Sequence, residues 1–107
     1  MNFLVNLGSG VTQEQRIVNA SSWSTCLAYC EGTGLTIVSI QSLPSSNIVQ
    51  ISTETTDCYQ GTIKVNGVAS QYFVWANSFD SFNTWFESLT NPVLQNIQFS
   101  NKLYVTV

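Results

Sequence analysis

The chain has 107 residues, a length that corresponds to one domain of ordinary size. Only 8% of the residues are charged and the net charge is −3, with Arg16, Lys64 and Lys102 as the cations. Three scattered cations neutralise too few phosphates for ordinary nucleic-acid binding, and no apolar run reaches the roughly 18 residues of a membrane span. Because a surface with so little charge tends to associate, we expect protein partners or self-association.

The first half of the chain predicts the order strand–strand–helix–strand–strand. The helix covers residues 22–31, with Ser21 as its N-cap and with Gly32 and Gly34 ending it. Alternating apolar residues, bounded by turns at Gly8-Ser9-Gly10 and at residues 43–46, mark the strands. These strands are residues 2–7, 15–20, 35–40 and 47–52.

The second half predicts the same order of elements. Asn66-Gly67 is a strong signal for a two-residue hairpin. The helix covers residues 78–89, with Asn77 as N-cap and Asp80 suited to the positive end of the helix dipole, and it ends before Asn91-Pro92. The strands are residues 59–65, 70–76, 93–99 and 103–107.

An internal alignment connects the two halves. An offset of 56 residues places residues 17–31 on residues 73–87, and large apolar side chains fall in step, such as Trp23 with Phe79. The identical pairs are Val18/Val74, Ala20/Ala76, Ser22/Ser78 and Glu31/Glu87. The pattern predicts an internal duplication. The expected fold is α+β: a tandem strand-strand-helix-strand-strand repeat with pseudo-two-fold symmetry, in which two helices pack on antiparallel sheet.

The chain is expected to form a single domain, residues 1–107. The first repeat covers residues 1–52, a polar linker covers 53–57, and the second repeat covers 58–107. A half of about fifty residues is marginally stable alone, so the two repeats are expected to close over one shared core.

Helical spacing places large apolar residues in one stripe on each helix, which predicts that both stripes are buried. The predicted core residues are Trp23, Cys26, Leu27, Cys30, Phe79, Phe82 and Phe86. The Cβ atoms of Cys26 and Cys30 are expected about 5–6 Å apart, beyond the roughly 3.8 Å of a disulfide, so both are predicted to be free thiols. Without histidine, the three cysteines offer too few ligands for structural zinc, and neither a metal site nor a cofactor is predicted.

The strand before the second helix predicts a partner-binding patch of Tyr72, Phe73 and Trp75. The position that matches Trp75 in the first half is the polar Asn19, which suggests that this face meets solvent in at least one half. Trp75→Ala would then weaken association and leave folding largely intact. The alternative is that the other half buries this face, as in a sandwich.

Catalytic residues are not evident. Without histidine, a serine or cysteine nucleophile lacks its usual base. The matched carboxylates Glu31 and Glu87 would suit an acid/base couple if symmetry brought them together, but solvated surface glutamates are the ordinary explanation. We therefore do not expect an enzyme.

The segments "VNASSW" (18–23) and "VWANSF" (74–79), each followed by an aromatic residue and a glutamate, resemble small uncharacterised phage-encoded proteins. The resemblance covers about fifteen residues in each half. It implies a viral origin and a place in the virion. The other expected location is the host cytoplasm, because the first residues lack the basic start and apolar segment of a secretory signal.

The leading hypothesis is a non-enzymatic structural or assembly protein, a minor phage virion component that acts through apolar faces and strand edges. One alternative is a module that binds carbohydrate or a host surface, with Trp75 or Tyr72 as a stacking platform. Another is a host-directed phage inhibitor whose acidity mimics nucleic acid.

Overall fold

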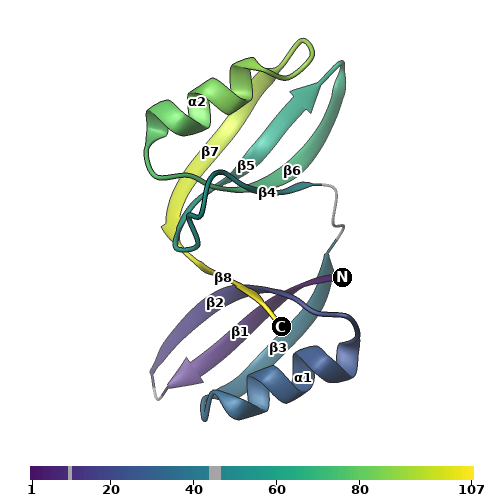
Figure 1. Ribbon diagram of the computed structural model, residues 1–107, viewed down its shortest axis with the longest axis vertical. Helices are drawn as coiled ribbons and strands as arrows, with labels where there is room; N and C mark the ends of the chain where they lie inside the picture. Colours follow the sequence, from purple (N-terminus) through teal and green to yellow (C-terminus); the bar gives the residue numbers. More distant parts are fainter. Residues whose placement is uncertain (10, 44–46) are drawn as a thin grey trace. The chain divides into compact units, whose positions relative to one another are not determined.

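A computed structural model of the chain describes residues 1–9, 11–43 and 47–107. These residues form two helices and eight strands in two mixed sheets, which confirms the α+β class (Figure 1). The predicted turns at Gly10 and at residues 44–46 lie outside the described residues. The elements are β1 (Asn2–Ser9), β2 (Thr12–Asn19), α1 (Trp23–Gly32), β3 (Thr36–Leu43), β4 (Ile48–Gln50), β5 (Asp57–Val65), β6 (Val68–Trp75), α2 (Phe79–Glu87), β7 (Val93–Asn101) and β8 (Leu103–Thr106).

The chain folds into two compact units. Unit 1 contains Met1–Ser45 and Lys102–Val107, and its sheet has the order β3-β1-β2-β8. Strands β1, β2 and β3 pair antiparallel, whereas β8 runs parallel to β2. Helix α1 covers one face of this sheet (Figure 1). The core between helix and sheet consists of Phe3, Val5, Leu7, Val18, Ala20, Cys26 and Cys30.

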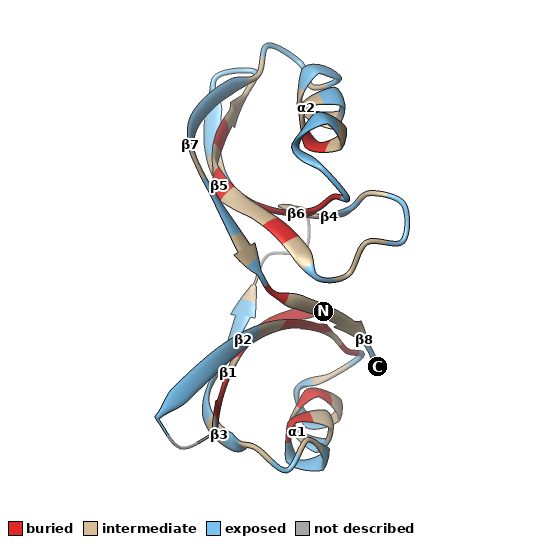
Figure 2. Ribbon diagram, turned by 90° about the vertical axis from the view of Figure 1, so that its left-hand side faces the viewer, coloured by how far each residue is buried: buried red, intermediate tan, exposed pale blue. Residues whose placement is uncertain are grey.

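Unit 2 contains Ser46–Asn101, and its sheet has the order β4-β6-β5-β7. Strands β5, β6 and β7 pair antiparallel, and β4 runs parallel to β6. Helix α2 covers one face, and residues coloured as buried lie on α2 and on the central strands β5 and β6 (Figure 2). The buried core there is Ile63, Val74, Ala76 and Phe82.

The two sheets match position by position. Asn2 pairs with Asn19 in unit 1, and Cys58 pairs with Trp75 in unit 2, an offset of 56 residues on both strands. The register of β3 on β1 shifts after Asn6, and that of β7 on β5 shifts at the corresponding Thr62. These matches concern the pairing of the strands alone. The ancestral duplication and the pseudo-two-fold axis remain predictions.

The sheets are mixed, so the prediction of purely antiparallel sheet is wrong for β4 and β8. Strand β7 ends at Asn101 and β8 begins at Leu103. One intervening residue, Lys102, is too short for the two-residue turn of a hairpin. The chain therefore runs directly from the sheet of unit 2 into the sheet of unit 1.

The helices begin one residue later than the cap prediction implied. The N-caps are Ser22 and Ser78, whose side chains each accept a hydrogen bond of 3.2 Å from the backbone N–H three residues on. Ser21 and Asn77, the predicted caps, precede them. Asp80 lies in the first turn of α2 as predicted.

The left-handed backbone predicted at Asn66-Gly67 and at Gly34 is confirmed, but Gly32, also expected to end the first helix, is the last residue of α1 and has no positive φ. Asn66 and Gly67 have φ angles of 50° and 84° between β5 and β6, as a type I′ hairpin requires. Gly34 follows α1 with a φ of 75°, the conformation that glycine adopts most readily after a helix.

A short loop between β4 and β5 is closed by one carboxylate. Glu54 Oε1 accepts hydrogen bonds from the backbone N–H of Thr56 and of Asp57, and from Thr56 Oγ1, at 2.8–2.9 Å. These bonds favour the ionised form and lower the pKa of Glu54.

We expect Glu54→Gln to lower the urea midpoint at pH 7 and to have less effect in acid. The folded-state pKa of Glu54 is depressed, so its contribution to stability is present above the unfolded value of about 4.3 and is lost as the pH falls through the folded value. Urea titrations of both proteins at pH 7 and near pH 3 test this. An equal midpoint difference at both pH values would contradict it.

Candidate interaction surface

The structure buries most of the predicted aromatic patch. Trp75 has 0% and Phe73 has 4% of its surface exposed, and Tyr72 is half-buried. The prediction that this patch is exposed is therefore wrong. Strand β6 is a central strand, and Phe73 and Trp75 have neighbours on β4 as well as on β5. Tyr72 lies on the helix-facing side, with its ring 5.8 Å from that of Trp85.

The helical stripes are only partly core. Cys26, Cys30 and Phe82 are buried as predicted, and Leu27 and Phe86 are half-buried. Trp23 and Phe79, however, are 51% and 52% exposed, so the core prediction is wrong for these two. Each is the first residue of its helix. Because side chains tilt toward the helix N-terminus, a side chain at that position projects beyond the first turn and covers little of the sheet.

Phe79 belongs to an exposed aromatic cluster at the edge of unit 2. Tyr59 on β5 pairs across the sheet with Phe99 on β7, and their ring centroids are 5.2 Å apart. Phe79 contacts Tyr59 at 6.1 Å from the helix side, and Phe82 stacks on Tyr59 at 5.2 Å. Phe99 is 56% exposed, so two of these four rings present much of their area to solvent.

The cluster adjoins a strand edge without charge. Strand β7 is the terminal strand of its sheet and carries no Asp, Glu, Lys or Arg. Val93 and Leu94 are also exposed along it. We call Val93, Leu94, Phe99, Phe79 and the outer edge of β7 the β7 surface.

One feature of the β7 surface limits the length of edge that a partner strand can use. Thr62 pairs with Asn96 and the next residue, Ile63, pairs with Leu94, so Gln95 is an extra residue in β7 at this point. Such an extra residue is a β-bulge. Bulges, charges and prolines are the usual protections of an edge. Here the bulge is the one protection within β7, and Asn96–Asn101 pair regularly beyond it.

Unit 1 has a related surface. The rings of Trp23 and Phe3 are 6.1 Å apart and nearly perpendicular, as are those of Phe79 and Tyr59. Strand β3 is the terminal strand there; it is also uncharged and exposes Val38. The position that corresponds to Phe99 in the pairing is Ser42, so this surface has fewer exposed aromatic rings.

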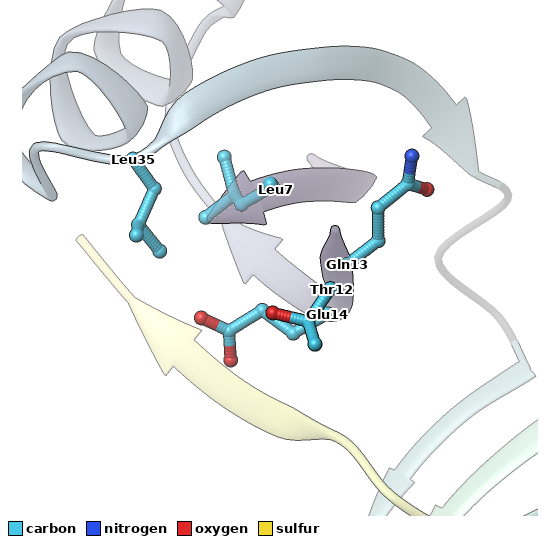
Figure 3. A pocket seen from close by; sticks show the side chains of 6 residues that line it. Leu7, Thr12, Gln13, Glu14 and Leu35 are labelled. Atoms are coloured by element: carbon cyan, nitrogen blue, oxygen red, sulfur yellow. The ribbon is translucent and has the colours of Figure 1, made fainter. Parts of the chain in front are cut away.

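Two hollows in unit 1 offer little chemistry. The residues Leu7, Gly8, Thr12, Gln13, Glu14 and Leu35 line one of about 120 Å³ (Figure 3). The other is an open depression beside Arg16, whose guanidinium donates to Tyr29 Oη at 2.7 Å and to Glu14 Oε1 at 2.9 Å. The Arg16 guanidinium therefore bonds to two side chains of the same unit, and the carboxylate of Glu14 balances its positive charge.

The remaining predicted site residues do not assemble into a reactive group within either unit. Glu31 on α1 and Glu87 on α2 belong to different units and are exposed, and Glu87 accepts a hydrogen bond from Asn83. Among the described residues, no three His, Cys, Asp or Glu side chains are grouped to hold a metal ion.

Cys26, Cys30 and Cys58 are buried and none of them forms a disulfide, which confirms that Cys26 and Cys30 are not bridged. Burial, with a smaller contribution from Cys30, raises the pKa of the Cys26 thiol to about 11, and burial also raises that of Cys30. We expect native protein to react with Ellman's reagent far more slowly than protein in guanidinium chloride, because the nucleophile is the thiolate. Rapid reaction of native Cys26 would contradict this.

Comparisons with known proteins add no relative: no family model, no curated protein and no solved structure matches the chain. Within the described part of the chain, neither helix has the length and apolar character to cross a membrane.

Proposed function

We propose that the protein is a non-enzymatic assembly protein that joins neighbouring copies through the β7 surface. The observation that carries this proposal is the combination in β7 of a terminal position, an uncharged sequence and exposed apolar side chains. An exposed edge of this kind offers backbone N–H and C=O groups to a further strand, and the exposed rings add apolar contact area.

The charges beside β7 favour a second copy as the partner. In the neighbouring strand, Lys64 pairs with Val93 at one end of β7 and Asp57 pairs with Asn101 at the other. If two β7 strands align antiparallel, the Lys64 end of one copy lies along the Asp57 end of the other. Opposite charges then lie at the same ends of the joined sheet, about 14 Å apart across three strand spacings, and neither β7 strand carries a charge of its own.

A place as a minor component of a phage virion is the finer part of this proposal. It is supported by the sequence resemblance in residues 18–23 and 74–79 and by the low charge of the whole chain. The tandem repeat with pseudo-two-fold symmetry belongs here too, supported by the matched strand order and registers of the two units. Such a subunit would carry two similar edges, β3 and β7.

The double variant Leu94→Lys and Phe99→Lys should weaken self-association at least tenfold. Paired β7 strands would bring these lysines close to their counterparts, and like charges at an interface are repulsive. Light scattering across a concentration series measures the change. Val11→Lys is the matched control, because Val11 is fully exposed and belongs to unit 1, whereas β7 belongs to unit 2. A strictly monomeric wild-type protein, or equal loss in the control, would contradict the proposal.

A second candidate function is carbohydrate binding at Trp23. Trp75 is fully buried and cannot serve as the stacking platform, whereas Trp23 presents about half of its surface. Sugars stack on exposed aromatic faces of this kind. Titration of glycans against tryptophan fluorescence, with Trp23→Phe as the comparison, tests it: a fluorescence change that is lost in the variant supports the candidate, and no change with any glycan contradicts it.

A further inference from the structure

The first half of the chain (residues 1–52) supplies β4 to the sheet of unit 2. The second half (residues 58–107) supplies β8 to the sheet of unit 1. Strand β4 follows β3 in sequence but pairs with β6 in unit 2, and β8 follows β7 but pairs with β2 in unit 1. Neither half therefore completes a four-stranded sheet with its own strands alone.

The two exchanged strands dock in the same way. Tyr104 faces Ile17 and Ile48 faces Phe73, an offset of 56 residues on both strands. One residue beyond each pairing, Val107 N–H donates to Asn19 O at 2.9 Å and Ile51 N–H donates to Trp75 O at 2.8 Å. The outer edges of β2 and β6 are therefore equivalent acceptor sites for a short parallel strand.

We propose that these acceptor edges bind β8 and β4 from a second copy of the chain, and that the loop of residues 51–56 determines whether the halves pair within one chain or between two. The contacts are identical in both arrangements, which is why exchange of an element is a low-cost route to a dimer. In the single chain, the covalent loop raises the effective concentration of one half near the other and favours internal pairing.

The loop must span a fixed distance. Ile51 bonds to Trp75 O on one side of β6, and Asp57 O accepts from Ala76 N–H on the other side. Strands β4 and β5 are thus separated by β6, so the loop crosses two strand spacings, about 9–10 Å. Glu54 holds it in a closed turn through its bonds to Thr56 and Asp57.

Deleting Ser52–Thr56 joins Ile51 directly to Asp57. Adjacent Cα atoms are about 3.8 Å apart, which is too short for the internal crossing. In the deletion variant, β4 and β8 can pair only with the β6 and β2 strands of a second copy. We expect its mass by light scattering to be about twice that of its own chain, at every concentration at which it is folded.

The experiment separates this exchange from association through β7. Both the deleted protein and its control carry Leu94→Lys and Phe99→Lys, which suppress β7 pairing without touching β4 or β8. In the control, residues 52–56 are replaced by a glycine–serine loop of the same length, and this protein should remain monomeric. A folded, monomeric deletion variant would overturn the inference.

If the deletion variant does not fold, a second measurement tests whether the acceptor edges bind β4 and β8 without a covalent connection between the halves. A protease site is inserted after Thr53 in the otherwise intact chain, and the folded protein is then cleaved. The two fragments should co-elute in native buffer and separate only in denaturant, because each fragment contributes a strand to the other's sheet. Separation of the fragments in native buffer would overturn the inference.

Discussion

Trp75→Ala should lower the free energy of unfolding by about 3–5 kcal/mol, the usual range for truncating a fully buried tryptophan. Trp75 is the largest of the fully buried side chains among the described residues, and it lies on a central strand between Gln50 and Cys58. Whole domains are stabilised by only about 5–15 kcal/mol, so much of this variant could be unfolded at room temperature. Urea denaturation followed by circular dichroism measures the loss.

The matched control is Trp23→Ala. Trp23 is half exposed and contacts Phe3 by its ring edge, so its truncation should cost about 1–2 kcal/mol. Equal losses for the two variants, or a loss below about 1 kcal/mol for Trp75→Ala, would contradict the burial described here. The expectation from sequence was the opposite, with Trp75 important for association and not for folding.

Gly61→Ala should destabilise the protein by about 3 kcal/mol, the upper end for forcing extra atoms into a packed site. A Cβ atom on Gly61 would overlap the carbonyl oxygen of Asn96 and come within 2.9 Å of Ile97 Cα. Both are backbone atoms of β7, which can yield only if β7 moves away from β5. The same urea titration measures the loss.

Gly8→Ala is the control for this prediction. Gly8 is also a strand glycine, but its nearest neighbour would be a methyl carbon of Val38 at 3.4 Å, an ordinary contact distance. We expect this change to cost less than about 1 kcal/mol. If Gly61→Ala proves as mild, β5 and β7 do not approach as closely at this point as the structure shows.

Local signals in the sequence predicted the elements well. Asn66-Gly67 requires left-handed backbone and therefore marked the hairpin, and helical spacing identified Cys26, Cys30 and Phe82 as buried. The caps were displaced by one residue because Ser21 and Ser22 are chemically equivalent as caps, and their order alone does not distinguish them.

Long-range pairing was not accessible from the sequence. Nothing in residues 103–107 indicates that they pair with β2 instead of β7, because a four-residue apolar strand fits either edge. Trp75 was expected in solvent because it matches the polar Asn19 in the first half, and that match does not reveal that β6 is a central strand.

The candidate surface was missed for a related reason. The sequence grouped Phe79 with the helix stripe and did not connect it with Phe99, twenty residues further along the chain. The two rings belong to one cluster because both contact Tyr59, which pairs with Phe99 across the sheet. A list of exposed apolar positions on an uncharged terminal strand would have found the surface, but it requires the strand order.

Amide hydrogen exchange at low and high protein concentration tests the central claim most directly, that copies of the chain associate through the edge of β7. If they do, peptides from residues 93–101 gain protection as the concentration rises, while peptides from the central strand β6 do not change. Exchange in residues 93–101 that is independent of concentration, in a protein whose mass nevertheless increases, would show that another surface joins the copies and would contradict the account.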